Sequence, residues 1–367
     1  PDPDQPAYRI VNFDTLADAY ATQVSALIEG GVDLLLVETI YDGLNAKAAL
    51  YAISKVQEEK GTNLPVMLSV TVNDKSGRTL TGQSLDALFT SLSHYPILSF
   101  GLNCSFGARE LHQFIRELAP HVPCNISIYP NAGLPNEMGE YDESPEFTAL
   151  CLQNMAKEGL INIAGGCCGT TPEHILKTKL ACDDIPVCEI TDKNRTVISS
   201  YSHAVTFGGR PILIGERINP TGKPKFKQAL KDKDLTYILS MGVAQQESRA
   251  DVLDVNVGLP GIDEPQMMVD VVKELQGVLD LPLQIDTSDP VAMERALRIY
   301  NGKPLINSVN GKKEVMEQIF PLVKHYGGVV VALALDENGI PETADGRLAV
   351  ARKIYETAAS YGIPKKD

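Results

Sequence analysis

Short apolar runs alternate with longer amphipathic segments along almost the whole of this chain. The runs have the length of strands, and the segments between them show the apolar spacing of helices. Strands that are apolar over most of their length are buried on both faces, as in a parallel sheet covered by helices. The pattern therefore predicts an α/β fold. In the first half, the expected strands are 34–39, 66–72, 98–104, 125–131 and 161–168.

The alternation is interrupted once, over 183–210, and then restarts. The interruption is rich in polar residues, glycine and proline, which is typical of a linker between domains. We therefore expect one domain over 1–182, a partly ordered linker, and a second domain over 211–367. The first long helix of the second domain is expected over 224–247. Its expected strands are 212–219, 252–257, 283–288, 305–310 and 329–336.

Polar side chains gather at the ends of the apolar runs in both halves. In (β/α)8 barrels the active site is built at the carboxyl ends of the strands, so this distribution favours two consecutive TIM-type barrels. Each half supplies only about five βα units of the eight that close a barrel, and the chain begins with Pro1 rather than Met. We therefore expect the C-terminal part of one barrel and the N-terminal part of the next, with little activity from this chain alone.

The composition restricts the classes of partner. A net charge of −14 argues against nucleic acid, which attracts basic surfaces. No uninterrupted apolar run approaches the about 18 residues of a membrane span, so we expect no membrane partner. Seven cysteines in 367 residues are too few for a disulfide scaffold, which favours a cytoplasmic location.

Two adjacent cysteines, Cys167 and Cys168, stand between glycines in the run Gly-Gly-Cys-Cys-Gly at 165–169. Neighbouring side chains on a regular strand point to opposite faces, so two that share one target need a kink, which glycine permits. A third cysteine, Cys104, ends another expected strand. Three thiolates would bind zinc and leave a fourth position for a ligand, as in catalytic zinc sites. The alternative is that all three are buried packing residues, the common role of free cysteine.

Asn131 ends the expected strand between those that carry the cysteines. If the five strands are the last five of a barrel, its amide oxygen would lie close enough to fill the fourth zinc position without substrate. Three thiolates reduce the Lewis acidity of zinc, so the site suits the deprotonation of a substrate thiol better than the activation of water. The chemistry expected from these residues is therefore alkyl transfer to a thiol.

Several segments of the first half resemble the family of zinc-dependent homocysteine methyltransferases. They are Gly-Leu-Asn-Cys at 101–104, Pro-Asn-Ala-Gly at 130–133, Gly-Gly-Cys-Cys-Gly-Thr-Thr-Pro at 165–172, Glu-Thr at 38–39 with Asp42, and Arg-Thr-Leu-Thr-Gly at 78–82. The resemblance covers about 8–182 and implies that Cys104, Cys167 and Cys168 bind zinc. It also implies that Glu38 helps to hold homocysteine, although an acidic partner for a helix N-terminus is the alternative.

Carboxylates and amides gather in the second half. They are Glu216, Asn219, Asp254, Asn256, Asp286 and Asn307. At the mouth of a barrel they would match a flat heterocycle such as a pterin, whose 2-amino-4-oxo edge both donates and accepts hydrogen bonds. The alternative for each residue taken alone is a local cap at the end of a strand.

The motifs Gly-Glu-Arg-Ile-Asn, Asp-Val-Asn, Ile-Asp-Thr-Ser and Asn-Ser resemble those of pterin-binding methyltransferase domains over about 205–367. That resemblance implies that Asp286 and Asn307 hold the pterin of methyltetrahydrofolate. It implies that the other four residues of the set shape the pocket.

A homocysteine domain followed by a methyltetrahydrofolate domain resembles the family of cobalamin-dependent methionine synthases. The resemblance implies a methyltransferase that moves a methyl group from 5-methyltetrahydrofolate, via cobalamin, to zinc-bound homocysteine. The sequence lacks the corrinoid signature Asp-x-His-x-x-Gly, so cobalamin would be bound by a module downstream or on another chain. The alternatives are a cobalamin-independent homocysteine S-methyltransferase, an enzyme such as dihydropteroate synthase, and a non-catalytic scaffold that retains both folds.

Overall fold

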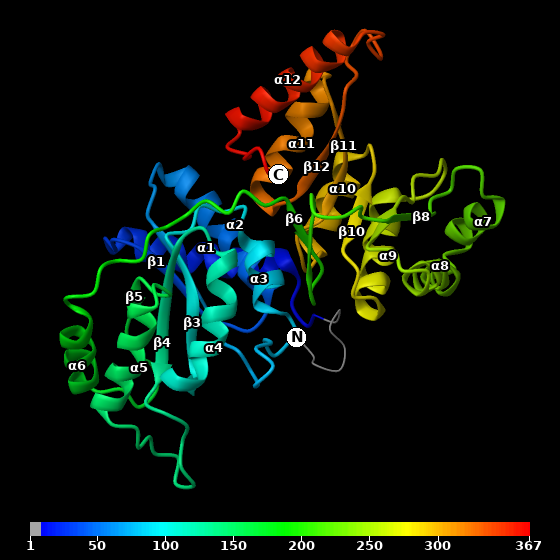
Figure 1. Ribbon diagram of the computed structural model, residues 1–367. Coiled ribbons are helices and arrows are strands. Elements are labelled where there is room, and N and C mark those ends of the chain that lie inside the picture. Colours follow the sequence, from blue (N-terminus) through cyan, green and yellow to red (C-terminus); the bar gives the residue numbers. More distant parts are fainter. Residues whose placement is uncertain (1–8) are drawn as a thin grey trace. The chain divides into compact units, whose positions relative to one another are not determined.

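The computed structural model describes residues 9–367, which divide into two compact units (Figure 1). One unit comprises 18–89 and 96–194, and the other comprises 195–367 with the short segments 9–17 and 90–95. Each unit contains a parallel sheet of five strands in chain order. The expected α/β fold, with two TIM-type units of about five βα repeats each, is confirmed. Neither sheet closes into a barrel within the part of the chain that the structure describes.

The first sheet has the order β1-β2-β3-β4-β5. Its strands are β1 (Leu35–Ile40), β2 (Val66–Val70), β3 (Ser99–Gly107), β4 (Asn125–Asn131) and β5 (Ile163–Ala164). The helices of this half are α1 (Phe13–Glu29), α2 (Gly43–Lys60), α3 (Leu85–Leu92), α4 (Ala108–Leu118), η1 (Ala119–His121), α5 (Pro145–Lys157) and α6 (Pro172–Cys182).

The second sheet has the order β12-β11-β10-β9-β8. Its strands are β8 (Ile214–Ile218), β9 (Val252–Val255), β10 (Leu283–Asp286), β11 (Leu305–Asn310) and β12 (Val329–Leu333). The helices are α7 (Pro224–Asp232), α8 (Leu235–Glu247), α9 (Glu264–Val278), α10 (Pro290–Ile299), α11 (Lys313–Tyr326) and α12 (Ala344–Ser360).

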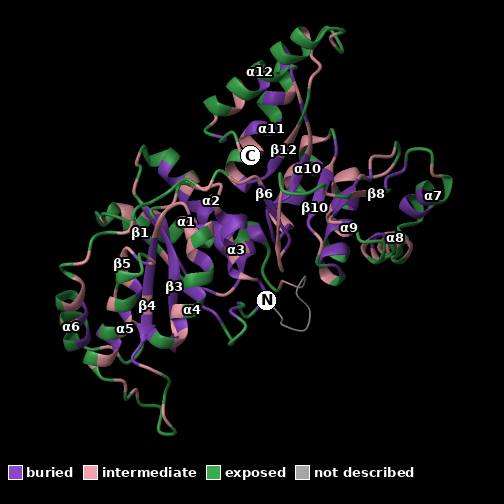
Figure 2. Cartoon of the chain, in the orientation of Figure 1, coloured by how far each residue is buried: buried purple, intermediate pink, exposed green. Residues whose placement is uncertain are grey.

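The central strands are buried on both faces, as Figure 2 shows for both sheets. Every residue of β2 and of β9 is buried. This burial explains why the strands read as continuous apolar runs rather than as an alternating pattern. No helix between residues 9 and 367 combines the length and the apolar character needed to cross a bilayer.

The helix expected over 224–247 is wrong as a single element, because the chain forms α7 and α8 instead. Lys233 adopts a left-handed conformation with φ 54°, which ends α7. Asp234 then caps α8 by accepting a hydrogen bond from the Tyr237 N–H at 3.0 Å. An αL residue followed by an Asp cap is a strong stop-and-start signal for helices.

The segment expected as a linker contains an antiparallel hairpin of β6 (Val197–Ser199) and β7 (Ala204–Thr206). Ser199 exchanges backbone hydrogen bonds with Lys303, at 2.9 and 3.1 Å. Ile198 packs with Val252 and Leu305 in the core of the second unit. The hairpin is therefore a packed part of that unit.

Candidate functional site

The sulfur atoms of Cys104, Cys167 and Cys168 all lie within 4.8 Å of one another. The Cys104 and Cys168 sulfurs are 3.8 Å apart, and those of Cys167 and Cys168 are 4.0 Å apart. Tetrahedral zinc with Zn–S bonds of about 2.3 Å separates its sulfur ligands by about 3.8 Å. The three thiols, here called the cysteine cluster, therefore have a spacing that fits one zinc ion.

Cys104 does not end its strand as expected, because β3 continues to Gly107. Cys104 and Ser105 instead have positive φ values of 63° and 62°, and the pairing of β3 with β4 is irregular between Asn103 and Gly107. A non-glycine residue rarely adopts this left-handed conformation. The two consecutive left-handed residues turn the Cys104 sulfur toward the other thiols.

The Cys167–Cys168 segment lies beyond β5, which is shorter than expected and ends at Ala164. The Cys167 N–H donates to the Pro130 carbonyl at 2.7 Å, and the Cys168 carbonyl accepts from the Ala132 N–H at 2.9 Å. Gly169 has a φ of 78°, and a Cβ added there would lie 2.3 Å from the Tyr141 Cβ. The flanking glycine is therefore required by both its conformation and its contacts, as the sequence indicated.

Asn131 is buried at the end of β4, beside the cysteine cluster. Its Oδ1 accepts a hydrogen bond from the Cys168 N–H at 3.1 Å. In this structure the amide oxygen therefore holds the cysteine backbone in place. Its role as a fourth zinc ligand stays a prediction.

Burial raises the pKa of the Cys167 thiol to about 11, and the adjacent Cys104 and Cys168 sulfurs act in the same direction. Without a cation, the Cys167 thiol would therefore remain largely protonated at neutral pH. A bound cation would reverse this preference, because it favours the thiolate form. The electrostatics of the donor set thus fit a metal ion.

Two tyrosines beside the cysteine cluster were not expected from the sequence. Burial raises the pKa of Tyr41 and of Tyr141, and the nearby cysteines add to both shifts. Tyr41 follows β1, and Tyr141 lies in the loop between β4 and α5. The position of Tyr41 directly after a strand is a signal that could have found it, whereas Tyr141 lies well beyond the end of β4 and gives no such signal.

Glu38 lies on β1 with an exposed side chain. The helix that follows, α2, is capped by Asp42, whose side chain accepts from the Asn45 N–H at 2.8 Å. The helix N-terminus therefore uses Asp42 as its acidic cap. Glu38 stays a predicted ligand for homocysteine.

In the second unit, Asp254, Asn256, Gln284, Asp286 and Asn307 form what is here called the polar cluster. Asn256 donates to the Asp286 carboxylate at 2.9 Å, and Gln284 donates to Asp254. Asp286 is in register with Asn307 on the adjacent strand, and Gln284 with Asp254. Gln284 was missed from the sequence, although a glutamine two residues before Asp286 in an apolar strand was the available signal.

Burial raises the pKa of Asp254 to about 6, and the negative charges of Asp286 and Glu216 act in the same direction. Hydrogen bonds from Gln284 and Asn307 partly oppose this shift. Burial also raises the pKa of Asp286, helped by Glu216 and opposed by the hydrogen bond from Asn256. The cluster therefore holds two carboxylates whose ionisation is costly until a donor partner binds.

The remaining two predicted residues lie at the edge of this arrangement. The Glu216 carboxylate is exposed on β8 and pairs with the Lys223 ammonium at 3.1 Å. Asn219 follows β8, and its Oδ1 accepts from the Thr221 N–H at 2.9 Å. Asn219 thus stabilises a local turn, while Glu216 contributes charge to the polar cluster.

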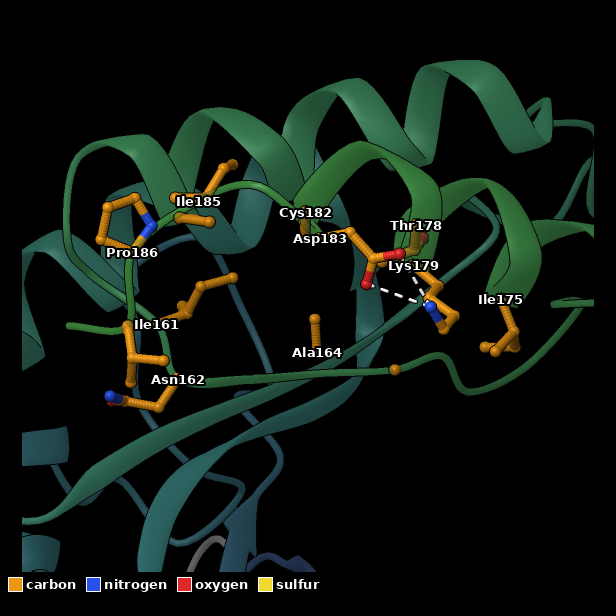
Figure 3. A pocket seen from close by; sticks show the side chains of 13 residues that line it. Ile161, Asn162, Ala164, Ile175, Thr178, Lys179, Cys182, Asp183, Ile185 and Pro186 are labelled. Carbon is orange, nitrogen blue, oxygen red and sulfur yellow. Dashed lines mark hydrogen bonds and ion pairs between the residues drawn. The ribbon is translucent and has the colours of Figure 1, made fainter.

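Each unit has a hollow at its surface. One of about 590 Å³ is lined by Asn256, Thr287 and the N-terminal residues of α9, at the carboxyl ends of β9 and β10. Another, of about 380 Å³, lies beside β5 and α6, where Lys179 and Asp183 form an ion pair (Figure 3). None of the three clustered cysteines lines the second hollow, so it is separate from their site.

Other titratable residues of the first half lie outside the cysteine cluster. His174 sits in the first turn of α6, where its side chain forms a capping box with Thr171. Its Nε2 lies 3.0 Å from the Glu143 carbonyl oxygen. Cys124, Cys151, Cys182 and Cys188 are free thiols outside the cysteine cluster.

Comparison with known proteins matches each half to a different family. Residues 2–182 match the model of the family "Homocysteine S-methyltransferase", and residues 215–367 match that of the family "Pterin binding enzyme". The chain joins a homocysteine S-methyltransferase domain to a pterin-binding domain. This order is the architecture of the corresponding methionine synthase modules, as the sequence motifs predicted.

Among solved structures, the apo form of the Escherichia coli homocysteine methyltransferase MmuM is 22% identical, with a TM-score of 0.35, over 47% of this chain and 58% of that one. The carboxyl transferase domain of Rhizobium etli pyruvate carboxylase is 15% identical, with a TM-score of 0.20, over 97% of this chain and 53% of that one. The chain thus spans little more than half of either protein.

Proposed function

We propose that this chain supplies the two substrate-binding domains of a cobalamin-dependent methyltransferase that makes methionine and tetrahydrofolate. The homocysteine domain is assigned to 1–182 and the methyltetrahydrofolate domain to 211–367, with 183–210 between them. The observation that carries the proposal is the cysteine cluster, whose spacing fits zinc, in a chain that also has a pterin-binding domain. A cytoplasmic location is part of the proposal.

In this proposal Cys104, Cys167 and Cys168 hold zinc as thiolates. The metal supplies Lewis acidity that favours the thiolate form of homocysteine. Glu38 binds the amino group of homocysteine, and Asn131 holds the backbone of Cys168 in place through the Cys168 N–H. The chain thereby fixes both the sulfur and the amino acid end of the substrate, which lowers the entropic cost of the transfer.

In the second domain, Asp286 and Asn307 bind the pterin. The Asp286 carboxylate accepts hydrogen bonds from pterin N–H groups, while Asn256 keeps the carboxylate oriented. The remaining residues, Glu216, Asn219 and Asp254, shape the pocket. Cobalamin has no matching ligand signature in this chain, so it is assigned to a module downstream or in trans.

Binding measurements on the purified chain separate this proposal from its alternatives. We expect one zinc ion per chain and saturable binding of methyltetrahydrofolate. Zinc without folate binding would indicate a cobalamin-independent homocysteine S-methyltransferase, and folate without zinc an enzyme of the dihydropteroate synthase type. If neither ligand binds, the chain is a scaffold and the proposal is wrong.

A further inference from the structure

Asn103 is a buried amide that connects three strands of the first sheet just before the cysteine cluster. It is 1% exposed. Its Oδ1 accepts from the Ser69 hydroxyl at 2.7 Å and from the Thr39 N–H at 3.2 Å. Its Nδ2 donates to the Thr39 hydroxyl at 3.1 Å. One side chain therefore links β3 to the ends of both β1 and β2.

The Asn103 backbone is held as firmly as its side chain. Its carbonyl oxygen accepts a hydrogen bond from the Thr71 hydroxyl at 3.1 Å. Since Asn103 immediately precedes Cys104, these contacts fix the point from which the chain turns into the cysteine cluster. A buried amide held by several hydrogen bonds is rigid, because turning it breaks those bonds and leaves buried polar groups unpaired.

The residues that adjoin Asn103 have unusual backbone conformations. Thr39, which shares two hydrogen bonds with the amide, has a φ of 59°, and Cys104 and Ser105 have φ values of 63° and 62°. A β-branched residue such as threonine is rarely left-handed. Such conformations persist only where surrounding contacts outweigh their cost, and they concentrate at functional sites.

We propose that Asn103 is a positioning residue that sets the place of the Cys104 thiolate. Its side chain holds Thr39 in the left-handed conformation, directly after Glu38. Its backbone holds the start of the turn that brings the Cys104 sulfur to 3.8 Å from that of Cys168. The amide thereby couples the two ends of the predicted homocysteine site, and this role rests on the proposed zinc function.

The test uses Co²⁺ as the probe, because sulfur-to-metal charge-transfer absorption reports how many thiolates bind. We expect wild type to show the absorption of three thiolates. In Asn103→Ala the intensity should fall toward that of two, and the affinity for Co²⁺ should fall about 10- to 100-fold, as for other residues that orient metal ligands.

Asn162→Ala is the matched control. Asn162 also connects separate segments of this unit, since its Oδ1 accepts from the Ile126 N–H of β4 at 2.9 Å and its Nδ2 donates to the Cys188 carbonyl at 2.9 Å. Asn162 directly precedes β5, so it lies at the amino end of that strand, whereas Cys167 and Cys168 lie beyond the carboxyl end. We expect Asn162→Ala to lower the melting temperature yet leave the charge-transfer intensity unchanged.

If Asn103→Ala does not fold, Thr39→Val is tested in its place. Thr39 is exposed, and this change removes only the hydroxyl that accepts the hydrogen bond from the Asn103 Nδ2. That variant should weaken Co²⁺ binding in the same direction by a smaller factor. Wild-type intensity and affinity in the folded Asn103 variant, or in Thr39→Val when it is the one tested, would overturn the positioning role alone. Failure of wild type to bind Co²⁺ would overturn the zinc site and the positioning role together.

Discussion

The cysteine cluster and the polar cluster lie at the same end of two similar parallel sheets, yet the chain builds them differently. In the first, Cys104 is turned by left-handed backbone, and the Cys167–Cys168 segment depends on a glycine with a φ of 78°. In the second, Asp254, Gln284, Asp286 and Asn307 project from adjacent strands β9, β10 and β11, which pair in register with one another, while the pairing of β11 with β12 is irregular after Asn307. A compact metal ion requires convergence on one point, whereas a flat ligand can be met by side chains spread along strands.

The two clusters also differ in what they need from a ligand. A cation would favour the cysteine cluster, because burial and the adjacent Cys104 and Cys168 sulfurs disfavour the thiolate form of Cys167. The carboxylates of the polar cluster need hydrogen-bond donors, because burial disfavours their ionised forms. The same architecture thus supports two kinds of recognition, set by the side chains and local backbone at the strand ends.

The largest expected effect concerns the metal. Cys167→Ala should lower zinc affinity by at least about 100-fold, because it removes one of three ligands and one negative charge. Competition with a chelator measures this. Cys151→Ala, which changes a thiol outside the cysteine cluster, is the control and should bind zinc as wild type does. Full zinc retention by Cys167→Ala would remove the basis for the comparison.

The dependence on special backbone can be tested with one glycine from each site. Gly169→Ala should destabilise the first domain by about 2–4 kcal/mol, since it forces a left-handed alanine against Tyr141. Gly258→Ala in the second should change stability by less than about 1 kcal/mol, because its Cβ would meet the Asn256 Oδ1 only at 3.4 Å. Urea unfolding measures both, and equal effects would contradict the proposed difference in construction.

The independence of the two sites can be tested by replacing Asp286. Asp286→Ala should weaken methyltetrahydrofolate binding by about 1–3 kcal/mol, up to about 100-fold, because pterin donors lose their acceptor. Zinc content should stay unchanged. In a protein that also carries the cobalamin module, transfer from methyltetrahydrofolate should be impaired and transfer to homocysteine nearly intact. Loss of both half-reactions in a folded variant would show that the sites are not independent.

The smallest expected effect is a pH dependence. Folding raises the pKa of Asp254 to about 6, from a usual value of 3.8. Between these values the folded chain binds more protons than the unfolded chain, so stability falls as the pH rises from 4 to 6 and then levels off. Asp254→Asn cannot ionise and so should not lose this stability. The free energy of unfolding of the variant, relative to that of wild type, should therefore rise by about 1–2 kcal/mol from pH 4 to 6. Melting temperatures from pH 4 to 7 measure the effect, and parallel curves would show that Asp254 is ionised throughout.

The strands were predictable because their environment is uniform. Val66–Val70 and Val252–Val255 are buried on both faces, so nearly every residue there is apolar whatever its neighbours. The break between α7 and α8 was not predicted, because 224–247 shows no glycine or proline at the break. Lys233 carries the left-handed turn instead, and lysine gives no such signal from its residue type.

Residue types and their order were enough to make Cys104, Cys167 and Cys168 candidates to meet, because two glycine-flanked thiols and a third thiol in another apolar run form the donor set of a metal site. It also placed Asp286 and Asn307 on adjacent strands through the order of the apolar runs. The folded chain was needed to show that the three sulfurs lie within 4.8 Å of one another and that Asn103 connects β1, β2 and β3 beside them. Such contacts join residues far apart in the chain, and their geometry depends on strand register and left-handed turns that residue type alone does not specify.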